Sequence, residues 1–218
     1  MTGFVGWFLA HLGEVGSLTW SHLRLAVIPL LVGLALSVPL GALARRSRRW
    51  YAPIVGASSL LYTIPSLALF VALPAVLGTQ ILDPLNVVVA LTVYTVALLV
   101  RTVADGLGSV PEEVRAAAAA MGYRPLRRFW QVELPLAVPV IAAGTRVAAV
   151  SNVSLVSVAA LIGVPQLGQL FTDGFQRFFY TPLIWGIVLS LALALALDGL
   201  ILAVTRALTP WLRAGSPS

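Results

Sequence analysis

Few side chains of this 218-residue chain could carry out covalent or metal chemistry. The sequence has no cysteine, and its 14 basic residues are all arginines because lysine is absent. This composition excludes thiolate nucleophiles, cysteine-based metal sites, Schiff-base lysines and a nucleotide-binding P-loop. The two histidines, His11 and His22, lie near the N-terminus without a cluster of metal ligands beside them. The sequence therefore predicts no catalytic residue, no metal site and no cofactor bound by this chain.

Two charged side chains, Arg146 and Asp198, lie inside strongly apolar stretches. A charge in such an environment is costly unless it is paired, so it is by default a candidate for function. We expect Asp198 to pair with Arg146 in a structural role. The alternative is a proton relay, which would need a second buried carboxylate that the sequence does not indicate. Asp105 follows Arg101 by four residues and is expected to be paired or solvated at the edge of an apolar segment.

The elements that position these residues must lie in a membrane. Hydrophobic residues make up 59% of the sequence and charged residues 10%, and the mean hydropathy is +0.96. A soluble domain carries about 25% charged residues, and a chain of 218 residues could not bury this much apolar surface in water. Helices satisfy their own backbone hydrogen bonds in lipid. We therefore predict an all-α, polytopic membrane protein in which residues 1–218 form a single transmembrane domain.

Five apolar stretches are long enough to cross a bilayer, which takes about 20 residues. The second is interrupted at Pro65 and Pro74, and the fourth at Pro135, Pro139 and Gly144. The predicted spans are Leu23–Ala44, Ala52–Leu77, Leu85–Val103, Leu134–Val164 and Leu183–Val204.

Arginine placement orients these spans, because positive residues concentrate on the cytoplasmic side. Arg24 and Arg177 fall on the opposite side from most other arginines. We predict an N-terminus outside and a C-terminus in the cytoplasm, which requires an odd number of spans and agrees with five. The arginines assigned to the cytoplasmic side are Arg45, Arg46, Arg48, Arg49, Arg101, Arg115, Arg124, Arg127, Arg128, Arg206 and Arg213.

Polar residues in the second and fourth spans are candidates for a translocation path. Pro65 removes a backbone donor in mid-span, which is tolerated only against protein or a water-filled cavity. An ordinary proline kink is the alternative for the second span. The serine spacing of three in the fourth span also suits close helix packing. The candidates are Tyr62, Thr63, Pro65, Ser66, Ser151, Asn152, Ser154 and Ser157.

The segment between the third and fourth spans, residues 109–134, predicts two short helices joined by a tight turn. Ser109 and Glu112 have the spacing of a capping box, and the alanine run 116–120 has high helix propensity. Gly122 can take the left-handed conformation that ends a helix, and Pro125 starts the second helix. Two interpretations remain open: an amphipathic connector on the membrane surface, or a docking element for a cytoplasmic partner. DNA binding is disfavoured because both ends are tethered in the bilayer.

This segment resembles the EAA loop of ABC importer permeases, whose pattern is Glu-Ala-Ala, three residues, Gly, nine residues, Ile-x-Leu-Pro. Ala117 and Ala118 match the two alanines and Gly122 the glycine, while Val132 and Leu134-Pro135 match the end. Ala116 stands where the family has glutamate, so an acidic contact would have to come from Glu112 or Glu113. The resemblance implies that this coupling loop contacts an ATPase. Its expected contact residues are Glu112, Glu113, Arg115, Ala116, Ala117, Ala118, Gly122, Tyr123 and Arg124.

Other stretches resemble the permeases for glycine betaine, choline and carnitine within that family. They include the segment 62–70, Tyr-Thr-Ile-Pro-Ser-Leu-Ala-Leu-Phe, and the segments 132–146 and 159–168. The group usually has Gly-Ala-Gly-Gly-Leu-Gly where this chain has Gly163-Val-Pro-Gln-Leu-Gly168, a departure expected of a divergent branch or of one half of a heterodimer. The resemblance covers residues 23–208, roughly.

The resemblance implies a non-catalytic subunit in the inner membrane of a prokaryote, with a type I importer fold. Its expected partners are a second permease, identical or paralogous, two cytoplasmic ATPase subunits that hydrolyse ATP with Mg, and an external solute-binding protein. No nucleic acid is expected. Amino acids such as methionine are the alternative substrates. From other classes, the alternatives are an ion-coupled secondary transporter, which would need paired buried carboxylates, and a membrane scaffold without a path.

Overall fold

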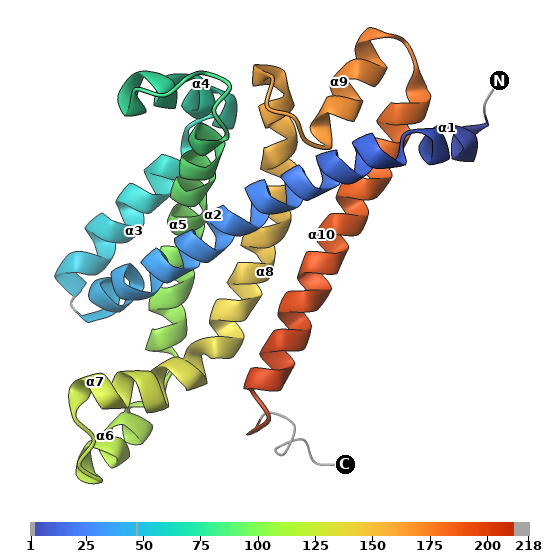
Figure 1. The fold of residues 1–218 in the computed structure, drawn as a ribbon. Helices are drawn as coiled ribbons and strands as arrows, with labels where there is room; N and C mark the ends of the chain where they lie inside the picture. Colours follow the sequence, from blue (N-terminus) through green and yellow to red (C-terminus); the bar gives the residue numbers. More distant parts are fainter. Residues whose placement is uncertain (1–2, 47, 212–218) are drawn as a thin grey trace.

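The computed structural model describes residues 3–46 and 48–211, and every regular element within them is a helix (Figure 1). Arg213, used above to orient the chain, lies outside the described residues, as does the side chain of Arg48. The elements are α1 Phe4–Ala10, α2 Leu12–Arg46, α3 Arg48–Thr63, α4 Ser66–Leu77, α5 Pro84–Gly108, α6 Glu112–Ala120, α7 Pro125–Arg128, the π-helical η1 Phe129–Glu133, α8 Leu134–Val158, the 3-10 helix η2 Ala159–Ile162, α9 Gly168–Gln176 and α10 Tyr180–Leu208.

Helices α2, α5, α8 and α10 are each long and apolar enough to cross a membrane. Helices α3 and α4 pass the same test only together, as one broken span, which brings the number of candidate spans to five. The predicted all-α membrane fold is therefore confirmed. The predicted sidedness of the two termini stays a prediction.

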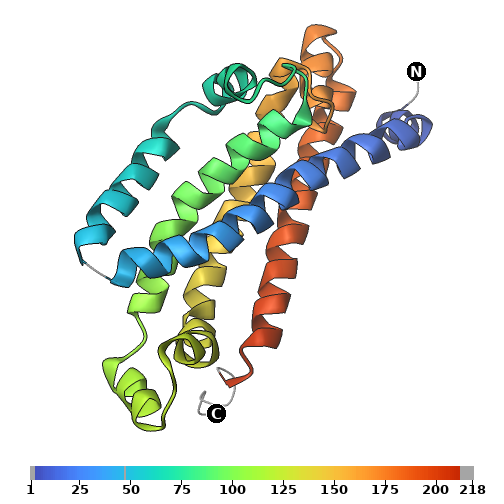
Figure 2. The same cartoon turned by 60° about the vertical axis from the view of Figure 1, so that its left-hand side comes forward.

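The second predicted span is bent far more sharply than a proline kink. Its two halves, α3 and α4, meet at an angle of 102° at Pro65, so that α4 lies across the end of the bundle (Figures 1 and 2). The predicted second interruption is wrong, because Pro74 lies inside α4 without ending it. Proline is tolerated inside a membrane helix, so its presence in the sequence does not by itself end one.

The fourth predicted span is longer and less interrupted than expected. The helical segment Pro125–Ile162 passes through Pro139 and Gly144 inside α8, and Pro135 lies in the first turn of α8. The second short helix of the loop, α7, is therefore continuous with this span through the π-helical turn η1. Proline is tolerated in membrane helices because neighbouring helices and local π adjustments satisfy the freed groups.

Two helices were not predicted. Helix α1 precedes the long α2 and packs against α10, where Phe8 stacks on Trp185 with ring centroids 4.2 Å apart. Helix α9 lies with α4 at the end of the bundle opposite α6 and α7 (Figure 2). Both are too short to register as spans in a hydropathy reading.

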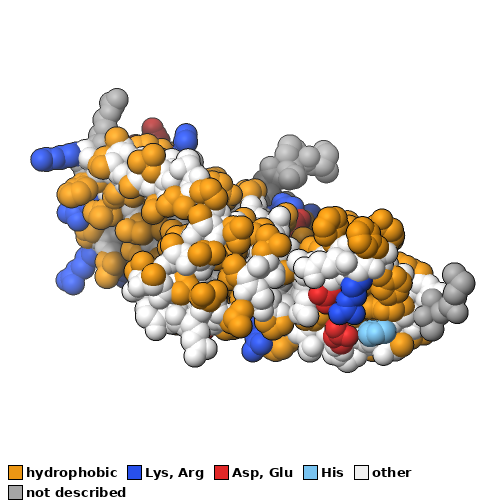
Figure 3. Space-filling view, turned by 90° about the horizontal axis from the view of Figure 1, so that it is seen from above, with side chains coloured by type: hydrophobic (Ala, Val, Ile, Leu, Met, Phe, Trp, Pro, Cys, Tyr) orange, Lys and Arg blue, Asp and Glu red, His pale blue; other side chains and the backbone are white. Residues whose placement is uncertain are grey.

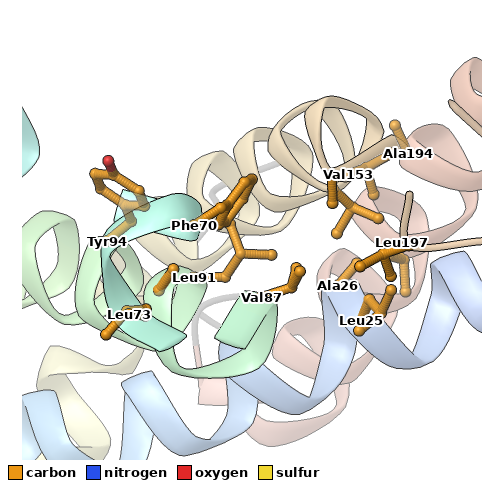
Figure 4. Close-up of a cluster of buried hydrophobic side chains, with 14 residues drawn as sticks. Leu25, Ala26, Phe70, Leu73, Val87, Leu91, Tyr94, Val153, Ala194 and Leu197 are labelled. Carbon is orange, nitrogen blue, oxygen red and sulfur yellow. The ribbon is translucent and has the colours of Figure 1, made fainter. Parts of the chain in front are cut away.

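The core lies where α2, α4, α5, α8 and α10 meet (Figure 4). Phe70 of α4 and Leu91 of α5 are fully buried there, beside Val153 of α8. The broken half-helix α4 is thus anchored by its apolar side chains. The outer surfaces of the helices keep many exposed leucines and valines, as expected for helices that contact lipid or a second subunit. Seen from above, hydrophobic side chains cover much of the face, and charged side chains form a few separate groups (Figure 3).

Helix α2 lies closely along α5 because small residues face it. A Cβ atom on Gly41 would lie 2.6 Å from Cγ1 of Val103 and 3.0 Å from the backbone nitrogen of Ala104. Gly33 makes the same kind of approach to Thr95. Small residues at such contacts let membrane helices approach closely.

We expect Gly41→Ala to lower the free energy of unfolding by about 1–3 kcal/mol, because the new methyl group overpacks the contact between α2 and α5. Gly16→Ala is the matched control in the same helix, since nothing lies within 4 Å of its Cβ position. Thermal unfolding of the purified variants in detergent measures the effect. Equal stability of the two variants would contradict the close approach at Gly41.

Candidate functional site

The short helix α6 ends in a complete glycine cap. Gly122 has φ +84°, in the left-handed region that glycine adopts without strain. Its N–H donates to the carbonyl of Ala119 at 2.9 Å, and the N–H of Tyr123 donates to that of Ala118 at 3.1 Å. This pair of bonds is the Schellman motif. Gly122 therefore fixes the turn between α6 and α7, as the sequence predicts.

The start of α6 differs from the predicted capping box. Pro111 is the N-cap residue, and its ring has no polar atom that could cap the helix. The Ser109 hydroxyl, predicted as the cap, donates instead to the carbonyl of Gly106 in the preceding helix α5. Glu112 accepts from Arg115, with 3.0 Å between Nε and Oε2. The acidic residues Glu112 and Glu113 still lie in the first turn, where they are favourable to the helix dipole.

Most of the predicted coupling residues lie on one open surface of the chain. Ala116 and Ala117 are exposed, as are Glu112, Glu113, Gly122 and Arg124. Ala118 is the member that faces inward, with 1% of its surface exposed. Tyr123 is half-buried and contacts the guanidinium of Arg127, 5.1 Å from the ring centroid. Small side chains on a short exposed helix leave its backbone accessible to a partner.

An ion-pair network ties this surface to the bundle. Glu133, at the end of η1, is 5% exposed and accepts from Arg45 of α2 at 2.7 Å and from Arg128 of α7 at 2.9 Å. A buried carboxylate needs such partners. The network links the end of α2 to the junction of α7 and α8. The sequence analysis did not identify Glu133 as a functional residue. Its position directly before an apolar span was the one signal in the sequence that could have pointed to it.

The break in the second span exposes the predicted path residues. Tyr62, Thr63 and Pro65 are exposed on the chain, and Ser66 is half-buried at the start of α4. The carbonyl of Ile64, freed by the break, accepts a hydrogen bond of 2.5 Å from the hydroxyl of Tyr94 on α5. The carbonyl freed at the break is thus hydrogen-bonded within the protein, while the side chains on the other side of the break stay exposed.

The polar residues of α8 divide between two environments. Ser154 is exposed, and Ser151 and Ser157 are half-buried. Asn152, in contrast, is 2% exposed, and its amide donates to the carbonyl of Ala26 at 3.2 Å and to the Thr95 hydroxyl at 3.0 Å. The structure therefore places Asn152 in a junction between α2, α5 and α8 and not on an open surface of this chain.

A second polar junction was not expected from the sequence. His22 of α2 is fully buried, with its Nδ1 3.0 Å from Oε1 of Gln166 and its Nε2 3.0 Å from the carbonyl of Val153. The same Gln166 oxygen accepts from the N–H of Gly168. This contact fixes the segment that precedes α9. A histidine inside an apolar run was the signal, but its partner is 144 residues away.

The structure also brings Arg146 of α8 and Asp198 of α10 together. Two parallel bonds of 2.7 Å join the guanidinium to both carboxylate oxygens. Both side chains are partly exposed, at 37% and 29%. Asp105 and Arg101 pair as well, at 3.5 Å, at the arginine-rich end of α5.

Comparison with known proteins assigns the chain to a family. Residues 33–210 match the family described as "Binding-protein-dependent transport system inner membrane component". The chain belongs to this family. The resemblance to ABC importer permeases is therefore confirmed, and the protein is an integral membrane permease component. Members of this family work with a binding protein and an ATPase partner.

Several known permeases cover nearly the whole chain. The chain is 35% identical over 209 residues to the osmoprotectant import permease protein OsmW of Salmonella typhimurium, with 94% of this chain and 97% of that protein covered. It is 29% identical to the choline transport system permease protein OpuBB of Bacillus subtilis, with 91% and 90% covered. A chain of the MetNI methionine ABC transporter in an inward-facing conformation has the same fold, at a TM-score of 0.75 and 21% identity, with 90% of this chain and 99% of that chain covered.

We expect Gly122→Ala to destabilise the turn of this permease by about 1–2 kcal/mol, because an L-residue is strained at a left-handed φ. Gly108→Ala is the matched control: its Cβ position is open too, and its φ is not positive. Hydrogen exchange of the α6 amides measures local opening. Equal exchange rates in the two variants would show that Gly122 is not needed for the cap.

We expect Asp198→Asn and Arg146→Gln each to lower the melting temperature in detergent, since each leaves a charged partner without its bidentate ion pair. The exchange Arg146→Asp with Asp198→Arg should recover part of the loss, because the pair is restored in reverse. A double exchange that is less stable than both of its own single changes, Arg146→Asp and Asp198→Arg, would argue against direct pairing.

Proposed function

We propose that this chain is the permease subunit of an ATP-driven importer for a compatible solute with a quaternary or related amine, such as glycine betaine, choline or carnitine. The observation that carries the proposal is helix α6: a short, exposed helix with a rigid glycine cap at the arginine-rich end, in a chain that belongs to a binding-protein-dependent transport family. The names of the relatives OsmW and OpuBB support the solute class.

In the proposed assembly, two permease subunits, identical or paralogous, enclose a path, and each presents its α6 to one of two cytoplasmic ATPase subunits. ATP and Mg are bound and hydrolysed by those subunits. The chain itself is non-catalytic and binds no cofactor. The complex lies in the inner membrane of a prokaryote, with the C-terminus and α6 in the cytoplasm. An external binding protein delivers the solute to the other end of the bundle.

Movement of α6 would be passed to the spans through two rigid links. The first is the chain itself, because α7, η1 and α8 form one continuous helical segment. The second is Glu133, which holds Arg45 of α2 and Arg128 of α7 at the same point. Because α2 packs along α5, a force on α6 would reach three spans together. Ala116 replaces the family glutamate, so the acidic contact to the ATPase is assigned to Glu112 or Glu113, which are both exposed.

The proposed path runs beside the broken span. Tyr62, Thr63, Pro65, Ser66 and Ser154 are the exposed or half-buried polar positions that would face it in the dimer. The exposed ring of Tyr62 suits a cationic solute, since an aromatic face attracts a quaternary ammonium group. Ser151 and Ser157 are the half-buried serines beside it, whereas Asn152 is assigned to the structural junction described above.

A methionine-type amino acid is the second candidate solute, favoured only by the shared fold with the MetNI chain. An ion-coupled transporter is less well supported. Among the described residues, the one buried carboxylate is Glu133, and it is neutralised by two arginines instead of facing a second carboxylate.

The test is transport in liposomes that contain the permease, its ATPase and its binding protein. We expect uptake of radiolabelled glycine betaine or choline that requires ATP inside and the binding protein outside. Uptake that persists without the ATPase, or that follows an imposed ion gradient, would overturn the proposal. Methionine uptake under the same conditions would retain the importer and reject the solute class.

We expect Ala117→Arg to reduce co-purification of the ATPase at least ten-fold, because a long charged side chain would stand on the proposed contact surface. A loss of about 1.4 kcal/mol in binding corresponds to ten-fold. Gln176→Arg, an equally exposed change in α9 at the opposite end, should leave ATPase association unchanged. Equal association of the two variants would remove α6 from the contact.

A further inference from the structure

A pocket of about 670 Å³, lined by six charged side chains among apolar ones, lies between α6, α7 and the end of α2, at the arginine-rich end of the bundle. Four arginines line it together with two glutamates, so its wall carries two more positive than negative side chains. The charged lining residues are Arg45, Arg46, Arg115, Arg128, Glu112 and Glu133.

The positive charge of this pocket is only partly neutralised by the protein. Glu133 is shared by Arg45 and Arg128, and Glu112 accepts from Arg115. Arg46 has no ion-pair or hydrogen-bond partner among the described residues. In the same part of the chain, Nη1 of Arg115 is a buried nitrogen without a hydrogen-bond acceptor. An unmatched buried donor is unfavourable, so an anionic group that reached it would be stabilised.

An apolar groove of about 740 Å³ continues from this pocket along α2 and the start of α8. The two cavities share Ala42, Arg46, Leu126 and Phe129. The groove reaches Ala35, eleven residues above Arg46 and hence about 16 Å along the helix axis. Its wall is almost entirely carbon, apart from Arg46 at its lower end.

The groove opens where the bilayer must lie. The α2 residues that line it belong to the apolar part of that helix, and Leu134 at the start of α8 lines it too. These α2 residues are Ala35, Val38, Pro39, Ala42 and Leu43. Trp130, which is 57% exposed, lines the groove near the charged end. Tryptophan favours the level of the lipid headgroups. The position of Trp130 therefore places the membrane surface near the boundary between the pocket and the groove.

We propose that pocket and groove together bind one anionic phospholipid of the surrounding bilayer. The phosphate-bearing headgroup lies among Arg46, Arg115 and the Arg45–Arg128 pair, and an acyl chain lies in the groove beside Ala42 and Phe129. Basic pockets beside membrane helices on the cytoplasmic side are typical sites for anionic headgroups. A free anion would fill only the charged half, and a protein partner would have to insert apolar side chains at the depth of the bilayer. The combination of charge and apolar length selects a lipid.

The test is native mass spectrometry of the full-length permease taken from nanodiscs that contain equal amounts of phosphatidylglycerol and phosphatidylcholine. We expect one phosphatidylglycerol to be retained per subunit in preference to phosphatidylcholine. Arg46→Gln removes one charge from the pocket without leaving a carboxylate unpaired. It should weaken lipid retention about five-fold, which is the contribution of one arginine near an anionic membrane surface. Arg124→Gln removes the same charge at a position outside the pocket and should retain lipid as the unmodified chain does.

A second arm separates lipid from free anion. Ala42→Phe fills the junction of pocket and groove, so it should reduce phosphatidylglycerol retention. Its melting temperature is measured in parallel, because Ala42 also packs against the buried cluster around Leu107. Added glycerol phosphate at millimolar concentration should fail to displace the lipid. Equal retention of the two lipids, equal loss in Arg46→Gln and Arg124→Gln, or full displacement by glycerol phosphate would each overturn the proposal.

Discussion

Lipid offers no hydrogen bonds to a polypeptide, so every polar group at membrane depth must find its partner within the protein. This constraint accounts for the main departures from simple straight spans. The break between α3 and α4 frees the carbonyl of Ile64, and the hydroxyl of Tyr94 takes it up. Asn152 and His22 join helices that are remote in sequence by the same requirement. The bundle is thus held at a few polar points, with apolar side chains between them.

Close helix approach supplies the rest of the cohesion. Helices in lipid gain no hydrophobic driving force from one another, so packing depends on how near their backbones come. Gly33 and Gly41 permit that approach between α2 and α5. Much of α10 remains unburied in the single chain, which leaves its apolar surface to lipid or to a second subunit.

The arginine-rich end combines two kinds of surface. Helix α6 is small, rigid and exposed, which suits contact with a soluble partner. The pocket behind it is positive and runs into an apolar groove. Glu133 binds arginines from both α2 and α7, so the same carboxylate ties α7, which follows α6, to the bundle and forms part of the wall of the pocket.

The sequence alone determined the class of protein, an all-helical membrane protein, together with the approximate spans and the turn at Gly122. Hydropathy, helix caps and charge are local properties, so a sequence pattern contains them. It also selected Arg146 and Asp198, since a charge inside an apolar stretch has few possible partners. Only the tertiary structure decided the 102° turn at Pro65, the passage of α8 through Pro139, and the partners of Glu133 and His22. Whether a proline bends a helix, or which group satisfies a buried polar atom, depends on neighbours far away in the chain, and a local pattern does not contain them.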